Sequence, residues 1–392
     1  MQYRNDLPIL GYGCMRFTKD SKGKLDYAKA EKEILRAYEL GIDYFDTAYL
    51  YNGSEELLGE VFEKNHMRDK VKIAAKLPQY MVRDRKGLDK YLDEELRRLR
   101  TDHIDYYFMH HMTDHAQLQK LMDMGFPEWV EEKKSQGKIG HIGFSYHGTT
   151  PTFLKILNAY PWEITIVQYN YMDETTQAGR TGVEAAAAKG IPVVIMEPLR
   201  GGKLVDLLPQ KAKDMISSDP HGWSAAEWAF RWLWDQKAVT CVLSGMNSID
   251  MIEENCRIAS NVTPGTFGEN EFAVIGKIKD AISETMKIGC TACGYCMPCP
   301  AGIDIPGYFR CYNHLYSEKK QSAHWEFIQT IALHHDSSLF GACLNCGKCE
   351  KHCPQNIEIR KELAIADRKL RSFPYNVAIP MAKRIMIGKK PQ

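Results

Sequence analysis

The chain has 392 residues, of which 44% are hydrophobic and 26% are charged, and its formal net charge is +1. This composition allows a sizeable core and argues against a disordered chain, and the balanced charge argues against a nucleic-acid or anionic-membrane partner. The N-terminus has no apolar signal core, and no stretch approaches the roughly 18 apolar residues of a membrane span, so we expect a cytoplasmic protein.

Residues 1–260 repeat one unit, a short apolar β-branched run followed by an amphipathic helix pattern. Eight alternating units close most simply into a (β/α)8 TIM barrel, and a doubly wound open sheet is the alternative. The predicted strands are Leu7–Gly13, Ile42–Asp46, Val71–Lys76, Ile104–His110, Ile139–Ser145, Ile164–Gln168, Ile191–Met196 and Val239–Ser244. The predicted helices cover residues 26–40, 54–64, 87–100, 114–136, 150–159, 176–189, 223–236 and 248–260.

Four polar side chains fall at or just after the ends of three consecutive predicted strands, where a barrel carries its active site. Asp46, Lys76 and His110 end these strands, and Tyr51 lies in the loop after Asp46. A phenol has an ordinary pKa of about 10, and a neighbouring ammonium lowers that pKa and makes the phenol a better proton donor. We therefore expect Tyr51 to protonate a carbonyl oxygen, Lys76 held by Asp46 to tune it, and His110 to orient the carbonyl. Each residue alone could be structural, but their joint position favours catalysis.

These residues resemble the catalytic tetrad of the aldo-keto reductase family. The resemblance covers roughly residues 5–260 and includes DTAxxYxxSE with Glu55, DYYFMH, GFS at 143–145, PLRGG at 198–202 and LSG…EEN at 243–255. It implies nicotinamide-dependent reduction of an aldehyde or ketone, with the carboxamide on Ser145 and Gln168. It also implies that the PLRGG loop holds the pyrophosphate and that the LSG…EEN stretch holds the adenosine end. The implied cofactor-binding residues are Gly13, Ser145, Gln168, Met196, Pro198, Leu199, Gly201, Gly202, Ser244, Gly245, Glu254 and Asn255.

Three positions depart from the family pattern. The asparagine that usually follows the serine is Tyr146, the aromatic residue that stacks on nicotinamide is Met196, and the basic residue that binds the 2′-phosphate of NADP is Met251. Loss of a cation opposite a phosphate removes a contact of about 1.5–3 kcal/mol. We therefore expect NAD(H) to be preferred over NADP(H), and a flavin stays open as another cofactor.

Nine of the 12 cysteines lie between residues 290 and 353, which points to metal rather than to the disulfides of a secreted protein. The second of two C-x2-C-x2-C runs has the spacing of bacterial two-cluster ferredoxins, in which the fourth cysteine ligates the other cluster, and the first run is one residue short. We therefore expect two [4Fe–4S] clusters, with zinc as the alternative. The predicted ligands are Cys290, Cys293, Cys296 and Cys353 for one cluster, and Cys343, Cys346, Cys349 and Cys299 for the other. Cys14 and Cys311 are expected to be buried thiols.

The predicted organisation is a barrel over residues 1–265, a linker and helix over residues 266–287, and a small, mainly helical ferredoxin-like domain over residues 288–392. Two clusters together carry two electrons, the same number as one hydride. A flavin normally mediates between one-electron clusters and two-electron nicotinamide, but the sequence shows no clear flavin motif. Three functional hypotheses follow. The first is an oxidoreductase whose clusters exchange electrons with ferredoxin or another redox protein. The second is a nicotinamide-dependent reductase with structural or docking clusters, and the third is a non-catalytic redox sensor. The complete tetrad argues against the third, and the oligomeric state is left open.

Overall fold

The computed structural model describes residues 1–290, 292, 294–317, 320–333, 338–353 and 355–386. The chain divides into two compact units. The first comprises Met1–Leu204 and Asp219–Ala273, and the second comprises Val205–Ser218 and Val274–Gln392. None of the helices in the described ranges combines the length and the apolar character that a bilayer crossing requires.

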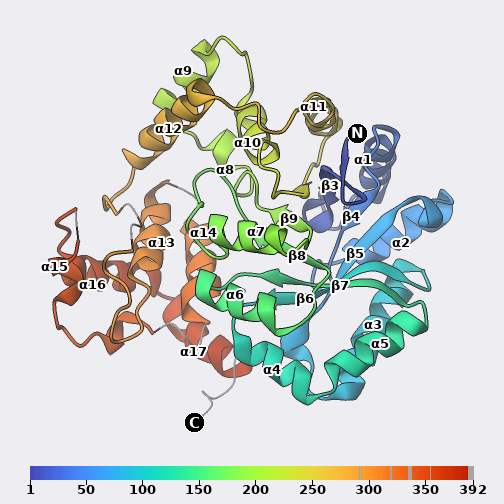
Figure 1. The fold of residues 1–392 in the computed structure, drawn as a ribbon, viewed down its shortest axis with the longest axis horizontal. Coiled ribbons are helices and arrows are strands. Elements are labelled where there is room, and N and C mark those ends of the chain that lie inside the picture. Colours follow the sequence, from blue (N-terminus) through green and yellow to red (C-terminus); the bar gives the residue numbers. More distant parts are fainter. Residues whose placement is uncertain (291, 293, 318–319, 334–337, 354, 387–392) are drawn as a thin grey trace. The chain divides into compact units, whose positions relative to one another are not determined.

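The first unit contains a closed barrel of eight parallel strands, which confirms the predicted barrel over the open sheet; all of these strands lie in the fully described range 1–290 (Figure 1). The strand order around the barrel is β10-β3-β4-β5-β6-β7-β8-β9. The first predicted strand is divided, because β2 (Leu7–Pro8) pairs antiparallel with β1 (Tyr3–Arg4) before the barrel begins. The barrel strands are β3 (Leu10–Gly13), β4 (Tyr44–Asp46), β5 (Lys72–Leu77), β6 (Ile104–Met112), β7 (Ile139–Tyr146), β8 (Ile164–Gln168), β9 (Val193–Met196) and β10 (Cys241–Ser244).

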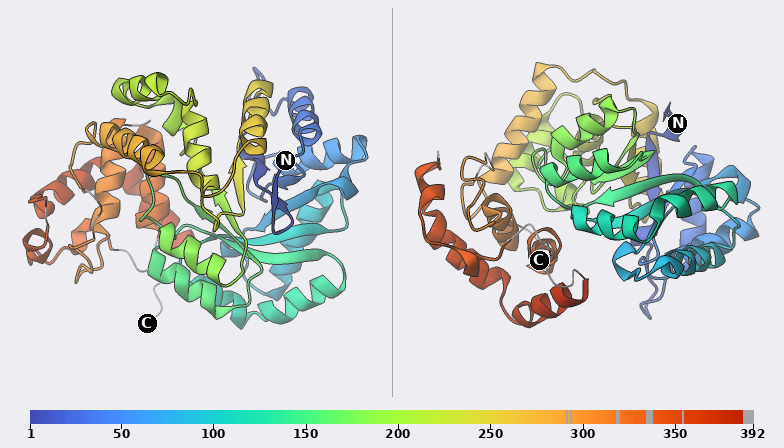
Figure 2. Two further views of the ribbon diagram at one scale, coloured as in Figure 1. Left: turned by 45° about the horizontal axis from the view of Figure 1, so that its top comes forward. Right: turned by 60° about the horizontal axis from the view of Figure 1, so that its bottom comes forward.

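Helices surround these strands (Figures 1 and 2). Asp26 caps α1, since its carboxylate accepts a hydrogen bond of 3.0 Å from the backbone N–H of Lys29. The single helix expected over residues 114–136 is wrong, because Gly125 adopts a left-handed conformation and divides it into α4 and α5. The helices are α1 (Tyr27–Glu39), α2 (Ser54–Lys64), α3 (Arg85–Leu99), α4 (His115–Asp123), α5 (Phe126–Ser135), α6 (Thr150–Ala159), α7 (Gly179–Ala188), α8 (Lys203–Asp206), α10 (Ala225–Trp234) and α11 (Ile249–Ser260). α12 (Glu269–Ser283) begins in the first unit and lies mostly in the second. Short 3-10 turns lie at Cys14–Arg16, Arg68–Lys70 and Gln79–Met81.

The barrel interior is filled with side chains, so it is a core and not a channel. Tyr44, Phe108, Ile166 and Val194 are fully buried in one cluster that also contains Cys241. Burial of these large apolar groups stabilises the fold and leaves the C-terminal ends of the strands as the place for polar side chains.

The second unit is helical in its described residues and has its own core. Tyr308 and Phe309 of α13 pack with Phe327 of α14 and Leu363 of α16. Cys311 is fully buried, as is Cys14 in the first unit, which agrees with the expectation for both thiols. The helices are α9 (Gln210–Ser218), α13 (Ile305–Ser317), α14 (Lys320–Phe327), α15 (Lys348–Lys351), α16 (Ile359–Leu370) and α17 (Tyr375–Met386), with a π-helical turn at Ile328–Ala332 and a 3-10 turn at Phe340–Ala342.

Candidate active site and cluster centres

The four predicted catalytic side chains come together at the C-terminal end of the barrel. Lys76 on β5 donates hydrogen bonds from Nζ to Asp46 Oδ1 at 2.5 Å and to the backbone oxygen of Thr47 at 2.7 Å. The same Nζ lies 4.8 Å from the centroid of the Tyr51 ring. The rings of Tyr51 and His110 meet edge to face with their centroids 6.0 Å apart. The ammonium therefore stands between a carboxylate and a phenol, with the imidazole across from the phenol.

The loop that carries Tyr51 is held on both sides. Arg98 of α3 donates from Nη1 to the backbone oxygen of Tyr49 at 3.2 Å and to Glu55 Oε2 at 3.1 Å. On the other side, Ser54 donates from its hydroxyl to the backbone oxygen of Cys14 at 2.9 Å. The glutamate and the serine begin α2, so the helix start and the arginine together fix the position of Tyr51.

The charges in this site shape the proton affinities. Burial raises the pKa of Tyr51, and the Lys76 ammonium opposes this only in part, so the pKa of the phenol lies above its ordinary value. The expected lowering by lysine is thus present but outweighed. Burial lowers the pKa of Lys76, but Asp46 and Tyr51 outweigh it, and the net pKa is raised. Burial and the nearby ammonium hold the pKa of His110 well below its usual range, so this imidazole is neutral near pH 7.

Two buried polar atoms of the site, His110 Nδ1 and Asp46 Oδ2, have no hydrogen-bond partner among the residues that the structure describes. Burial without a partner costs about 1–3 kcal/mol for a neutral group, and buried groups of this kind usually mark a functional site or an ordered water. These two atoms are therefore available for a water molecule or a ligand.

Of the two residues expected to hold a carboxamide, one is engaged by the protein itself. Gln168 at the end of β8 donates from Nε2 to Asp173 Oδ2 at 2.8 Å and accepts from the Gln177 amide at its own Oε1. Ser145 is buried on β7, and its hydroxyl accepts from the backbone N–H of His111 at 2.9 Å. The serine hydroxyl retains its proton for donation, whereas the glutamine would have to exchange its partners.

The loop after β9, which is expected to hold the pyrophosphate, is a series of tight turns. Met196 ends β9, and positive φ angles follow at Glu197, Arg200, Gly201 and Gly202. The backbone N–H groups of Arg200 and Gly202 donate to the carbonyl oxygens of Glu197 and Leu199, so in this structure they are engaged within the loop and not presented to the expected pyrophosphate. Pro198 and Leu199 complete this PLRGG segment.

Arg16 lies beside two of the loops expected to bind the cofactor, although it belongs to none of the motifs. Its guanidinium forms an ion pair of 3.2 Å with Glu197. Its side chain also packs closely on two glycines: a methyl group in place of the Gly201 hydrogen would lie 2.9 Å from it, and one at Gly245 would lie 3.2 Å from it. It thus stands between the β9 loop and the β10 loop. A basic residue shortly after the first barrel strand was the available signal.

The expected adenosine end lies at β10 and α11. Asn255 donates from Nδ2 to the Ser244 hydroxyl at 3.1 Å, and Ser224 donates to Glu254 Oε1 at 2.7 Å. Met251 is 48% exposed on the first turn of α11 and presents no charge. On this first turn the helix therefore offers no cation to a 2′-phosphate at the expected position. Gly13 and Gly245 lie close together at the ends of β3 and β10. A Cβ atom added to Gly13 would lie 3.5 Å from the backbone nitrogen of Gly245.

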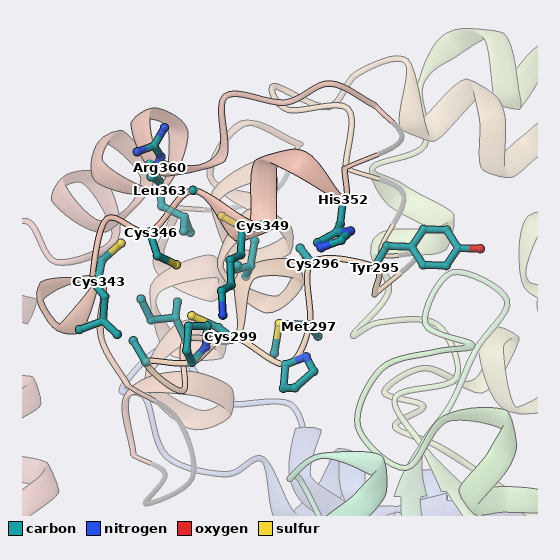
Figure 3. A pocket seen from close by; sticks show the side chains of 18 residues that line it. Tyr295, Cys296, Met297, Cys299, Cys343, Cys346, Cys349, His352, Arg360 and Leu363 are labelled. Atoms are coloured by element: carbon teal, nitrogen blue, oxygen red, sulfur yellow. The ribbon is translucent and has the colours of Figure 1, made fainter.

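The described cysteines of the two C-x2-C-x2-C runs line two neighbouring cavities, which share Cys296. The larger, about 370 Å³, is lined by Cys296, Cys299, Cys343, Cys346 and Cys349 among others (Figure 3). The smaller, about 20 Å³, is lined by Cys290, Cys296 and Cys353. The predicted ligand Cys293 lies outside the described residues.

The donor chemistry of these cavities fits iron–sulfur clusters. Nowhere in the described residues do three His, Cys, Asp or Glu side chains gather around a point as one metal ion requires. A cubane instead attaches each thiolate to its own iron, so its four cysteines stand around a larger volume. Five described cysteines line the larger cavity, which is enough thiolates for the four that one cubane needs.

The sequence model of the aldo/keto reductase family matches residues 9–266. The chain belongs to this family. A second family model, the 4Fe-4S dicluster domain, matches residues 289–358, which favours iron–sulfur clusters over zinc. The protein is thus an aldo/keto reductase-type oxidoreductase that also carries a 4Fe–4S dicluster domain.

Relatives and solved structures match the chain at low identity. The chain is 24% identical over 328 residues to L-glyceraldehyde 3-phosphate reductase of Escherichia coli O157:H7, covering 70% of this chain and 91% of that protein. It is 25% identical over 238 residues to an aldo-keto reductase of Gibberella moniliformis, covering 58% and 70%. Aldo-keto reductase AKR11C1 from Bacillus halodurans in its holo form superposes with a TM-score of 0.56 at 25% identity, covering 69% of this chain and 91% of that chain.

Proposed function

We propose that this protein reduces an aldehyde or ketone, or oxidises the corresponding alcohol, by hydride transfer in the barrel with Tyr51 as the proton donor. The observation that carries the proposal is the contact of Lys76 with both Asp46 and the Tyr51 ring at the catalytic end of the barrel. A bound nicotinamide supplies the hydride.

Each tetrad residue has one task in this proposal. Tyr51 transfers the proton of its Oη to the carbonyl oxygen as charge develops there, and Lys76 stabilises the phenolate that remains. Asp46 keeps the lysine charged, in line with the raised pKa of Lys76. His110 is neutral, so its imidazole donates a hydrogen bond that orients the carbonyl without competing as an acid.

For the cofactor we propose NAD(H) in preference to NADP(H), held by the twelve residues named above from Gly13 to Asn255. The support is the uncharged and exposed Met251 at the start of α11. We add Arg16 as a cation for the pyrophosphate, because it stands between the two loops that would bracket that group. The fission-yeast relative named aldo-keto reductase yakc [NADP(+)] is 25% identical over 211 residues. The proposed preference for NAD(H) would differ from the cofactor given in that protein's name.

For the dicluster domain we propose crossed ligation and electron exchange with a separate redox protein. Cys299 lines the cavity of Cys343, Cys346 and Cys349, Cys353 lines the cavity of Cys290, and Cys296 lines both cavities. The places of Cys299 and Cys353 support the proposal that each run lends its fourth cysteine to the other cluster.

The experiment is an anaerobic purification of the full chain, followed by assays of NADH-dependent reduction over a panel of aldehydes and ketones, with iron, sulfide and flavin analysis of the same sample. We expect turnover that depends on Tyr51, and clusters that a redox protein can reduce. Turnover with clusters that no carrier can reduce would leave a nicotinamide-dependent reductase with structural clusters, and no turnover with any carbonyl would refute the proposal.

A further inference from the structure

The two cysteine cavities of the second unit differ in charge. The larger cavity is lined by Lys348 and by Arg360, which is paired with Glu350 outside the lining, and no carboxylate is among its described lining residues. The smaller cavity has no charged side chain among its described lining residues. The potential of a cluster depends on net charge and on solvent exposure, and a nearby cation stabilises the extra negative charge of the reduced form. A cluster in the larger cavity is therefore the easier of the two to reduce.

The two cavities also differ in access. Cys346 is the one exposed cysteine among those that the structure describes, and it lines the larger cavity (Figure 3). Two further lining residues of this cavity are exposed apolar or aromatic side chains, Leu344 at 66% and Tyr295 at 68%. Together with the exposed Cys346 they give the larger cavity an accessible, partly apolar surround.

Lys348 lines this cavity, and Lys351 lies one turn further along the same short helix. The short helix α15 exposes Lys348 and Lys351, whereas its one carboxylate, Glu350, is engaged by Arg360 through a 2.7 Å ion pair. The charge that remains for a partner is positive. An apolar centre with a charged edge is the arrangement of small, transient electron-transfer interfaces, in which charge complementarity sets the rate of association.

We propose that the entry rim, defined as Tyr295, Leu344, Cys346, Lys348 and Lys351, docks a small acidic protein that carries single electrons. The cluster bound by Cys346 and its three companions is then the first to exchange electrons with that carrier. In each encounter one electron leaves the reduced carrier and reduces the oxidised cluster by one electron, with no bond or proton transferred. The inference rests on the cluster assignment of the proposed function and adds the site and the charge of the partner.

The test uses the anaerobic full-length holoprotein and reduced flavodoxin, an acidic carrier whose flavin absorbance is distinct from that of the clusters. The variant is K348E/K351E, and the matched control is K213E/K277E, which makes the same charge change at exposed lysines of α9 and α12. Iron content and carbonyl reduction are measured for each protein, so that damage to folding is recognised. Photoreduced 5-deazariboflavin serves as an uncharged reductant.

We expect the second-order rate of cluster reduction by flavodoxin to fall at least about tenfold in K348E/K351E at low salt. The difference is expected to shrink as salt rises, because screening weakens attraction between exposed charges. The control and the reaction with deazariboflavin are expected to stay within about twofold of the wild type.

Two results would overturn the inference while leaving the proposed function intact: equal flavodoxin rates in K348E/K351E and the control, or an equal slowing with the uncharged reductant. The second would show that the lysines act on the cluster and not on docking. A wild-type protein without any reducible cluster would instead remove the cluster assignment itself, together with the rim.

Discussion

The barrel and the cysteine unit place their reactive side chains in different ways. In the barrel, strand ends carry Asp46, Lys76 and His110, and Lys76 already contacts Asp46 at 2.5 Å. In the cysteine unit, most of the described cluster cysteines lie outside helices, and Cys346 is exposed while Cys299 and Cys349 are only partly buried. Hydrogen-bonded backbone can preorganise a proton-transfer site before any ligand binds, whereas a cluster has to draw its own ligands together.

Both units nevertheless have an apolar core of their own. The core of the second unit joins α13, α14 and α16 through Tyr308, Phe327 and Leu363. Loss of clusters is therefore expected to disorder the segments 289–303 and 340–358, while these three helices persist. The difference between the units lies in their sites rather than in their cores.

The largest expected effect tests the preorganised site. Tyr51→Phe removes the proposed proton donor and is expected to lower kcat/KM for carbonyl reduction by at least about 100-fold, with NADH binding and iron content unchanged. Lys76→Met is expected to be similarly harmful, because the phenolate loses its stabilising charge. Tyr49→Phe, in the same loop, is the matched control. Activity of Tyr51→Phe within a few-fold of the wild type would remove this residue as the donor.

Next in size is the cofactor preference of the barrel. The uncharged Met251 is expected to give NADH an advantage over NADPH of about tenfold or more in kcat/KM, from a lost contact of about 1.5–3 kcal/mol. Met251→Arg is expected to reduce or reverse that advantage, and Met251→Leu to leave it unchanged. Wild-type kcat/KM values that favour NADPH would show that another cation, such as Arg16 or Lys203, serves the 2′-phosphate.

In the cysteine unit, single replacements are expected to halve the metal content. Cys346→Ser and Cys353→Ser are each expected to lower the iron from about eight to about four per chain, and to empty different clusters as seen by electron paramagnetic resonance. The buried Cys311 provides the control, since Cys311→Ala is expected to retain all the iron. Loss of the same cluster in both variants would mean that each run holds its own cluster.

The smallest expected effect concerns how the Tyr51 loop is held. Burial raises the pKa of Glu55 to about 7, so folding favours its protonated form, and this contribution to stability is lost as the pH rises from about 4.5 through 7. The barrel melting temperature is therefore expected to fall by a few degrees between pH 5.5 and 8 relative to Glu55→Gln. The comparison with the variant is needed because His110, with its lowered pKa, acts in the opposite direction. Glu60→Gln at the surface of α2 is the control, and a wild type that gained stability with pH relative to Glu55→Gln would contradict this sign.

The sequence predicted the barrel and the meeting of the tetrad because both follow from local patterns. Apolar runs mark strands, and parallel strands in a barrel end on one face, so Asp46, Lys76 and His110 had to be neighbours. The break at Gly125 was missed because glycine is also tolerated inside helices. The engagement of Gln168 by Asp173 and Gln177, and the place of Arg16 between two loops, depend on packing between distant segments that no local pattern records.

The most direct test of the contrast between the two units is to remove the clusters from one sample and compare both sites before and after. The anaerobic protein is expected to contain about eight irons and eight sulfides per chain, and to lose reduction by flavodoxin when a chelator and oxidant remove them. The barrel is expected to keep its melting transition and its NADH binding within a few-fold. Stoichiometric zinc without sulfide, or a barrel that unfolds when the metal leaves, would contradict the account.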